Sequence, residues 1–309
     1  MKYVLISSSR NEEKFIPLTL DSVTRQTQLP ERWIIVDDGS IDRTGEIAES
    51  YAKIFPWITV IHNPRREGRS FAAKANNVNA AFAKLESDHA AFDAIGNLDT
   101  DTTFAPDYME FLMQKFAADP KLGCTGTPFT QDGGYDSTKD SFEGENYVAG
   151  PIQFFRRECF REIGGYVANP AGGVDWIAVM TARLKGWTVR SFADKRYHHH
   201  RSMGTAERGE VFALFSYGEK DYYLGGSPVW QLFRVTYRMA KKPYLVGGLA
   251  LFFGYFWAAL RRVKRPVSDD LMKFHRMDQM KKLKAILRSM LHLKKADNFR
   301  VASETGKTN

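Results

Sequence analysis

Two aspartates stand two positions apart after an apolar run, in the segment NLDTDTTF (97–104). If this segment is extended, Asp99 and Asp101 project to the same side and can converge on one cation. Carboxylate oxygens suit Mg²⁺ or Mn²⁺, which complete their coordination with water and substrate phosphates. Alternatively, Asp101 or Thr103 caps a helix that begins near Pro106. Taken alone, the spacing favours the helix cap.

Similar polar clusters follow other apolar runs, and the elements around them suggest why. Short apolar runs alternate with segments of helical periodicity, which predicts a mostly parallel, Rossmann-like α/β sheet with helices on both faces. Strands are predicted over 3–7, 33–40, 57–63 and 92–99, and helices over 13–26, 42–54, 70–85 and 106–119. Ligands of such sheets bind outside the carboxyl ends of the strands. The polar segments at those ends are SSSRNEE, VDDGSIDRT and NLDTD.

Two common nucleotide-binding signatures do not occur. No G-x-G-x-x-G follows the first strand, and no G-x-x-x-x-G-K-[ST] is present, so neither a dinucleotide-binding fingerprint nor a P-loop is expected. With only Cys124 and Cys159, the chain has no disulfide framework and no zinc cluster built on cysteines.

Five segments instead occur in a recognisable order: RNEEKFIPLTLDSVTRQT, WIIVDDGSIDRTGEI, NLDTD, FRRECFREIGGY and GGVDW. Together they resemble the family 2 glycosyltransferases of GT-A fold, over a stretch from about Tyr3 to His200. Each motif by itself is weak, whereas the ordered set is specific. The resemblance implies an inverting enzyme that uses a nucleotide-sugar donor, with UDP-sugars favoured.

The resemblance also implies roles for the residues at the strand ends. Asp38 would read the nucleotide base, and Asp101 would bind Mg²⁺ or Mn²⁺ on the diphosphate, with Asp99 near the ribose or the metal. The residues implied around the nucleotide-sugar are Ser7, Ser9, Glu12, Asp37, Asp38, Arg69, Lys74 and Asp99.

Three consecutive histidines lie in KRYHHHRSMG (195–204). Neutral imidazole can bind a metal, and His200 with Arg201 could contact the diphosphate; the plain alternative is a polar loop. The resemblance implies a histidine metal ligand after the catalytic region, and His199 and His200 are the candidates. The sequence alone does not choose among His198, His199 and His200.

Asp175 in GGVDW matches the position of the catalytic base, which would remove the acceptor hydroxyl proton during a single displacement. The family commonly carries another carboxylate just before this aspartate, where this chain has Val174. The structural alternative for Asp175 is the cap of the following helix.

The resemblance implies that the acceptor binds at the IGGY turn that ends FRRECFREIGGY and beside the catalytic base. The implied acceptor-binding residues are Gly164, Gly165, Tyr166 and Trp176. A glycine turn lets a sugar approach the backbone, whereas the alternative is a plain tight turn. QLFR (231–234) lacks the tryptophan that processive synthases carry after this motif, so transfer of a single sugar is expected.

The C-terminal part differs in character from the rest. Residues 243–260 form an uncharged stretch flanked by basic residues, at the short limit for a spanning helix. Basic residues at both ends favour an interfacial or re-entrant segment over a crossing one, with a buried hairpin hinged at Gly247–Gly248 as the alternative. A helical stripe with lysines opposite covers 268–293.

Charge supports a membrane surface as a partner. Between Arg261 and Asp297 there are 12 lysines and arginines against 4 aspartates, which accounts for the formal net charge of +8. A basic arm beside an apolar stretch favours anionic lipid rather than nucleic acid. Because MKYVLISSSRNEE shows no secretory signal, we expect a cytoplasmic protein, peripheral or monotopic on the inner face of the cell membrane.

The predicted domains are a glycosyltransferase domain (1–227, with a nucleotide-sugar-binding half over 1–104 and an acceptor-binding half over 105–227), a helical membrane-associating region (228–298) and a disordered tail (299–309). The expected function is transfer of one sugar to a membrane glycolipid or polyprenyl-linked glycan in surface-glycan or polysaccharide biosynthesis. The alternatives are a polyprenyl-phosphate sugar synthase, a sugar nucleotidyltransferase and a non-catalytic membrane-binding module.

Overall fold

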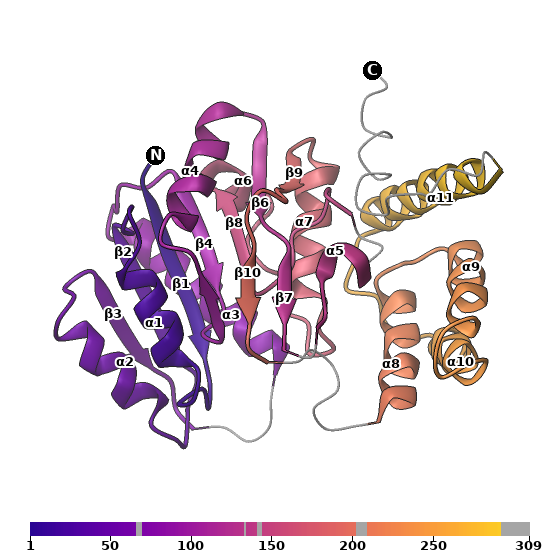
Figure 1. Cartoon of the computed structure of the whole chain (residues 1–309), viewed down its shortest axis with the longest axis horizontal. Helices are drawn as coiled ribbons and strands as arrows, with labels where there is room; N and C mark the ends of the chain where they lie inside the picture. Colours follow the sequence, from indigo (N-terminus) through magenta and orange to yellow (C-terminus); the bar gives the residue numbers. More distant parts are fainter. Residues whose placement is uncertain (66–69, 133, 141–143, 202–208, 292–309) are drawn as a thin grey trace. The chain divides into compact units, whose positions relative to one another are not determined.

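The chain divides into two compact units, shown in Figure 1. The first consists of Met1–Pro170 and Val174–Arg201, and the second of Ala171–Gly173 and Ser202–Asn309. The computed structural model describes residues 1–65, 70–132, 134–140, 144–201 and 209–291. Arg69 and the predicted tail 299–309 lie outside these described residues.

The first unit contains every strand among the described residues. Its strands are β1 Tyr3–Ser9, β2 Arg32–Asp37, β3 Ile58–His62, β4 Ala94–Leu98, β5 Thr102–Phe104, β6 Leu122–Gly126, β7 Phe129–Gln131, β8 Ile152–Arg156, β9 Thr188–Ser191 and β10 Tyr197–His199. Its helices are α1 Ile16–Thr24, α2 Thr44–Ala52, α3 Phe71–Ser87, α4 Tyr108–Ala118, α5 Ser137–Asp140, α6 Arg157–Glu162 and α7 Val174–Leu184.

A seven-stranded, mostly parallel sheet has the order β3-β2-β1-β4-β8-β6-β9, and β8 is the antiparallel member between β4 and β6. The strands and helices predicted for the N-terminal half are all present. The predicted mostly parallel α/β sheet, flanked by helices, is therefore confirmed.

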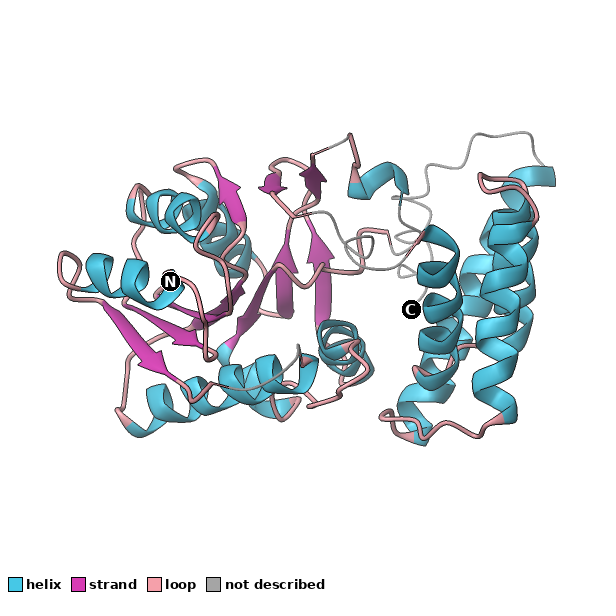
Figure 2. Cartoon of the chain, turned by 90° about the horizontal axis from the view of Figure 1, so that it is seen from below, coloured by secondary structure: helices cyan, strands magenta, loops and turns pink. Residues whose placement is uncertain are grey.

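Alternate residues of each central strand face opposite layers, as strand geometry requires. On β1, Tyr3 and Leu5 pack with α1 and α4, whereas Val4 and Ile6 pack with α3 and α7. Helices therefore cover both faces of the sheet, as Figure 2 shows. Both faces of β1 are fully buried, which explains why its sequence is a continuous apolar run rather than an alternating one.

A small three-stranded sheet, β5-β10-β7, completes the first unit. Strand β10 pairs antiparallel with β5 and parallel with β7, so that His199 lies opposite Thr102 on one side and Gln131 on the other. This sheet brings residues near position 200 to the end of β4. Local sequence patterns gave no indication of this pairing.

The second unit is helical. Its helices are α8 Glu210–Tyr223, α9 Pro228–Met239, α10 Val246–Leu260 and α11 Asp269–Leu291. The division after Arg201 differs from the boundary predicted at 227, because α8 packs tightly on α10 and belongs with the later helices.

The uncharged stretch 243–260 forms one helix, α10, and not a hairpin hinged at Gly247–Gly248. Those glycines lie in its first turn against Met239 and Leu214, so their small size serves helix packing. Among the described residues, no helix is both long and apolar enough to cross a membrane.

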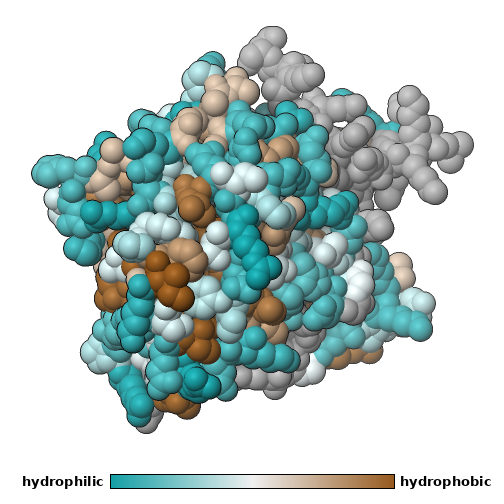
Figure 3. Space-filling model, turned by 60° about the vertical axis from the view of Figure 1, so that its left-hand side comes forward, coloured by the Kyte–Doolittle hydropathy of each residue, from teal (hydrophilic) through white to brown (hydrophobic). Residues whose placement is uncertain are grey.

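Figure 3 shows the face that comes forward when the left-hand side of Figure 1 is turned toward the viewer. Hydrophobic groups on this face are separated by hydrophilic side chains.

The contact of α8 with α10 depends on two glycines. A Cβ at Gly254 would overlap the carbonyl oxygen of Phe215, and a Cβ at Gly218 would overlap that of Leu251. Only glycine allows the two backbones this approach, which outweighs its low helix propensity.

We therefore expect Gly254→Val to separate the two helices and to lower the free energy of unfolding of the second unit by about 1–3 kcal/mol. Thermal or denaturant unfolding followed by circular dichroism measures this effect. Leu249→Ala, on the exposed side of the same helix, is the control and should cost much less. Equal stability of Gly254→Val and the unmodified protein would contradict the close approach.

Candidate active site at the carboxyl edge of the sheet

The carboxyl ends of β2, β1 and β4 meet at one edge of the large sheet. Ser9 pairs with Asp37 in the strand register, and the Asp38 amide donates a 2.8 Å hydrogen bond to the Ser9 carbonyl. The Ser9 and Thr100 hydroxyls lie 2.8 Å apart and are buried. The polar segments after these three strands therefore occupy one place, as their position in the sequence predicted.

Asp37 and Asp38 have different environments at this edge. Asp37 accepts a hydrogen bond from the Ser40 amide at 3.1 Å and lies 3.1 Å from Nδ1 of His62. It thereby holds the turn and the end of β3. Asp38 is buried in the turn beyond β2, next to the end of β1. Their positions leave Asp38 as the better candidate for contact with a nucleotide base.

Ser7 does not reach the edge. Its side chain is fully buried, and its hydroxyl accepts a 2.9 Å hydrogen bond from the Trp33 indole. Ser7 is therefore a core residue and does not lie beside the base as predicted. Successive strand residues alternate in direction, and only the end of the strand is accessible.

Lys74 and Asp99 form an ion pair across the edge. Lys74 lies in the first turn of α3, whose N-terminus is capped by the Ser70 hydroxyl. Burial raises the pKa of Asp99 above its ordinary value; Lys74 opposes this rise and the neighbouring Asp101 adds to it. The carboxylates of Asp99 and Asp101 together outweigh the charge of Lys74, and a cation can balance the remaining negative charge.

Asp101 lies in the turn between β4 and β5, so strand alternation is not what brings it near Asp99. The alternative as a helix cap is wrong, because α4 begins at Tyr108 with Asp107 at its N-cap position. Asp101 is 7% exposed, and its Oδ1 lies 3.3 Å from Nε2 of His199. Burial opposes its ionisation, but His199 and then Arg201 outweigh this and lower the pKa of Asp101.

Arg201 ties this carboxylate to the first strand. Its guanidinium donates a 2.7 Å hydrogen bond to Glu12 and lies 3.8 Å from Oδ2 of Asp101. Glu12 is fixed in turn, because its backbone amide donates to the Thr44 hydroxyl at 2.7 Å. The sequence placed Arg201 near a diphosphate but gave no indication of its ion pair with Glu12.

The residues fit a divalent cation. Within the described part of the chain, Oδ1 of Asp101 is buried without a hydrogen-bond partner. It faces His199, and two ligands at right angles on Mg²⁺ or Mn²⁺ lie about 3 Å apart, close to the observed separation. Asp101 and His199 are therefore the pair best placed to hold the ion. Asp99 is engaged by Lys74.

His198 and His200 point away from Asp101. They alternate with His199 on β10 and its continuation, and their rings contact each other with centroids 4.7 Å apart. The Nε2 atom of His200 lies 3.1 Å from the Thr103 hydroxyl. Strand alternation thus makes the choice that the sequence left open, for His199 and against His200 as the partner of Asp101.

Asp175 lies in the first turn of α7, one residue inside the helix rather than at its cap. Its carboxylate accepts a 3.1 Å hydrogen bond from the Tyr147 hydroxyl and packs against the backbone of Gly150. The segment 150–151 in turn accepts hydrogen bonds from the Asn97 side chain and the Asp99 amide at 3.0 and 2.8 Å. Asp175 and Asp99 therefore flank the same short segment.

The predicted acceptor turn ends helix α6, and its tyrosine is buried. Gly164 and Gly165 adopt positive φ and terminate α6, with the Gly165 amide bonded to the Phe160 carbonyl. Tyr166 is buried and donates a hydrogen bond from its hydroxyl to Gln153 at 2.7 Å. Trp176 is also buried. Gly164 and Gly165 thus make the helix-ending turn that was the alternative, and Tyr166 and Trp176 are core residues, while Gly164 itself stays exposed.

The ion pair between His62 and Asp37 generates a pH prediction. Hydrogen bonds to Asp37 and then Glu49 raise the pKa of His62 above about 6.5. The stabilisation from protonated His62 is therefore fully present below about pH 6.5, and it is lost as pH rises through the raised pKa of His62. His62→Gln should therefore lower the melting temperature more at about pH 6 than at about pH 9. The difference in the free energy of unfolding should be about 0.2–1 kcal/mol, the contribution of an exposed ion pair. In an Asp37→Asn background this pH dependence should shrink; an equal loss at both pH values would contradict it.

Comparisons with known proteins show the family of this chain. The sequence model described as "Glycosyl transferase family 2" matches residues 5–169. An uncharacterized glycosyltransferase of Haemophilus influenzae is 32% identical over 57% of this chain and 51% of its own length. The putative glycosyltransferase EpsH of Bacillus subtilis is 29% identical over 53% of this chain and 45% of its own length. The chain thus spans about half of these relatives.

Solved structures share the fold at low identity. The mannosyltransferase PcManGT from Pyrobaculum calidifontis, in complex with GDP-Man and Mn²⁺, has a TM-score of 0.56 and 16% identity, covering 98% of this chain and 86% of its own. Staphylococcus aureus TarS 1–349 in complex with UDP-GlcNAc has a TM-score of 0.55 and 15% identity, covering 99% and 92%. Because the family model matches more than half of the 309 residues, the chain belongs to glycosyl transferase family 2.

Proposed function

We propose that this protein is an inverting, metal-dependent glycosyltransferase that moves a single sugar from a nucleoside-diphosphate sugar to a lipid-linked or glycan acceptor. Two observations support the proposal: the Asp101–His199 pair after β4, and the Asp175 carboxylate packed on the segment 150–151, which accepts a hydrogen bond from the Asp99 amide. Donor complexes of the fold neighbours, with GDP-Man or UDP-GlcNAc, support the donor class.

Donor binding would use the edge from β2 to β4. Asp38 offers a carboxylate to a base, and Lys74 offers a cation to the diphosphate or ribose side. Asp101 and His199 would hold Mg²⁺ or Mn²⁺, which supplies charge stabilisation for the diphosphate leaving group. Arg201 would keep Asp101 ionised and add positive charge at the same place.

Asp175 would act as the base on the acceptor side. The acceptor oxygen forms a bond to the anomeric carbon while the bond from that carbon to the diphosphate oxygen breaks. The acceptor proton passes to the Asp175 carboxylate, and the bonding electrons leave with the nucleoside diphosphate. Tyr147 positions Asp175 through its hydroxyl hydrogen bond.

Two substitutions separate the proposed roles. Asp101→Asn should remove metal-dependent donor binding, and turnover should fall at least about 100-fold because leaving-group charge is no longer stabilised. Asp175→Asn should leave donor binding unchanged and lower turnover about 10²–10⁴-fold because the proton has no acceptor. Donor binding is measured by thermal shift with UDP-, GDP- and dTDP-sugars, with and without Mn²⁺, and turnover by nucleoside diphosphate release.

Asp107→Asn, at an exposed aspartate before α4, is the matched control and should retain both properties. Full turnover by Asp101→Asn would refute metal dependence through this residue. Absence of a shift with every donor would refute the donor site and favour a non-catalytic membrane-binding protein.

The protein would bind its acceptor at the cytoplasmic face of a membrane. Large apolar side chains follow one face of α10 at helical spacing, and Phe253 and Trp257 are 57% and 48% exposed. Val211 and Phe212 of α8 are also exposed, and they line with Phe253 a groove of about 550 Å³ between the two helices. Arg261 and Arg262 follow directly, and an apolar face beside basic residues suits an anionic lipid surface.

Liposome co-sedimentation tests the membrane proposal. Vesicles with anionic lipid should retain the protein. The double variant Phe253→Ser, Trp257→Ser should bind at least about tenfold more weakly, since it lacks the two exposed aromatic side chains that would insert into the lipid. Ile54→Ser, at a well-exposed residue of the first unit, is the control. Unchanged binding by the double variant, or displacement of the protein by nucleic acid, would contradict this proposal.

A further inference from the structure

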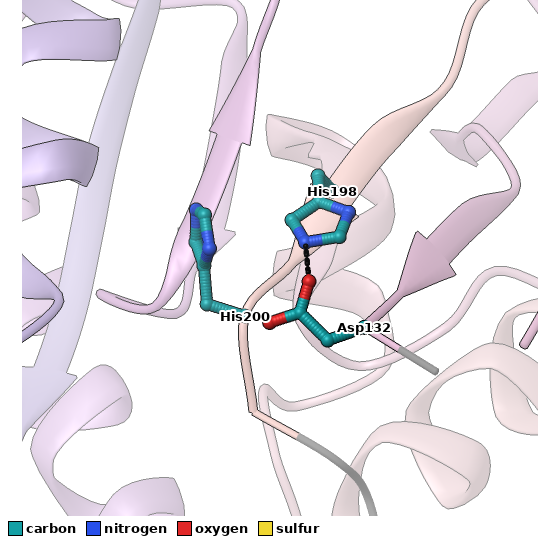
Figure 4. Close-up of side chains that lie close together, drawn as sticks. All are labelled: Asp132, His198 and His200. Atoms are coloured by element: carbon teal, nitrogen blue, oxygen red, sulfur yellow. Dashed lines mark hydrogen bonds and ion pairs between the residues drawn. The ribbon is translucent and has the colours of Figure 1, made fainter. Parts of the chain in front are cut away.

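A second cluster of metal-ligating side chains lies on the other face of β10. Asp132 follows β7, and His198 and His200 project from β10 and its continuation. One ligand atom from each of the three residues lies within 4.8 Å of the others. Figure 4 shows the His198 ring and the Asp132 carboxylate in contact, with His200 beside them; His198 Nε2 lies 3.0 Å from Asp132 Oδ1.

Each imidazole is oriented by a threonine. His198 Nδ1 lies 3.3 Å from the Thr130 hydroxyl, and His200 Nε2 lies 3.1 Å from the Thr103 hydroxyl. When a ring N–H donates to the threonine hydroxyl, the other ring nitrogen is free to bind a metal, as in known metal sites. His198 would therefore use Nε2 and His200 would use Nδ1. A stacked ring contact with Phe15 further fixes the plane of His200.

We propose that Asp132, His198 and His200 form a second metal site, which binds a transition ion such as Zn²⁺. Two imidazole nitrogens and one carboxylate suit Zn²⁺, Co²⁺, Ni²⁺ or Cu²⁺ better than Mg²⁺, which prefers oxygen ligands. One negative charge among two neutral rings suits a divalent ion. Three protein ligands leave a coordination position for water or another small ligand.

This site is separate from the one proposed for the donor metal. His199 faces Asp101 from the opposite side of β10, because successive strand residues alternate in direction. The ion would join the end of β7 to β10 just before Arg201, and so would hold the strand that supplies His199 and Arg201 to the active site. The site rests on its own three side chains and does not depend on glycosyl transfer.

Zinc titration of the metal-stripped full chain without nucleotide tests the proposal. Isothermal titration calorimetry should show a zinc site that the unmodified chain and Asp101→Asn both retain. His200→Ala and the milder Asp132→Asn should each weaken binding at least about tenfold. Asp132 is exposed, so Asp132→Asn leaves the fold unchanged even if His200→Ala does not. His89→Asn removes an exposed histidine outside the cluster and is the control.

Cobalt provides a second measurement. Co²⁺ bound by two imidazoles and a carboxylate should give visible absorption bands that are lost in His198→Ala and Asp132→Asn but retained in Asp101→Asn. Three results would overturn the proposal: no zinc binding, zinc binding that Asp132→Asn and His200→Ala leave unchanged, or zinc binding that is lost in Asp101→Asn or His89→Asn. The cluster would then be a hydrogen-bonded group of polar side chains only.

Discussion

The buried carboxylate of Asp101 is the constraint on which the site depends. A carboxylate that is 7% exposed needs compensating charge, because burial strongly disfavours an unpaired ion. Arg201 supplies the opposite charge and His199 a polar neighbour, both almost a hundred positions later in the chain. The small sheet β5-β10-β7 delivers both residues to the turn after β4. The pairing of β10 with β5 and β7 therefore places a positive charge beside Asp101 and also packs part of the first unit.

Strand β10 gives its two faces different chemistry. One face turns His199 toward Asp101 and the sheet edge, and the other turns His198 and His200 toward Asp132. Three identical residues in a row thus acquire separate environments from strand geometry alone. A change that shifts the register of β10 by one residue would exchange the two faces and disturb both clusters.

The packing of the second unit depends on close contact between two helices. Gly218 and Gly254 let α8 and α10 approach closely, so α10 buries one side of an almost wholly apolar helix. The other side keeps large apolar side chains exposed beside a basic segment. The contact also explains why α8 groups with the later helices, whereas hydropathy along the chain suggested a boundary at 227.

The sequence by itself determined the N-terminal strands and helices, their mostly parallel sheet and the polar segments at its carboxyl edge, since these follow from local periodicity and from the geometry of parallel strands. The ordered motifs, through their resemblance to the family, also led to the predicted roles of Asp101 and Asp175, which remain predictions. Only the tertiary structure decided that Ser7 and Tyr166 belong to the core and that His199, not His200, faces Asp101. The reason is physical: burial and side-chain direction at these positions are set by pairings such as β10 with β5, between residues far apart in the chain, which no local pattern encodes.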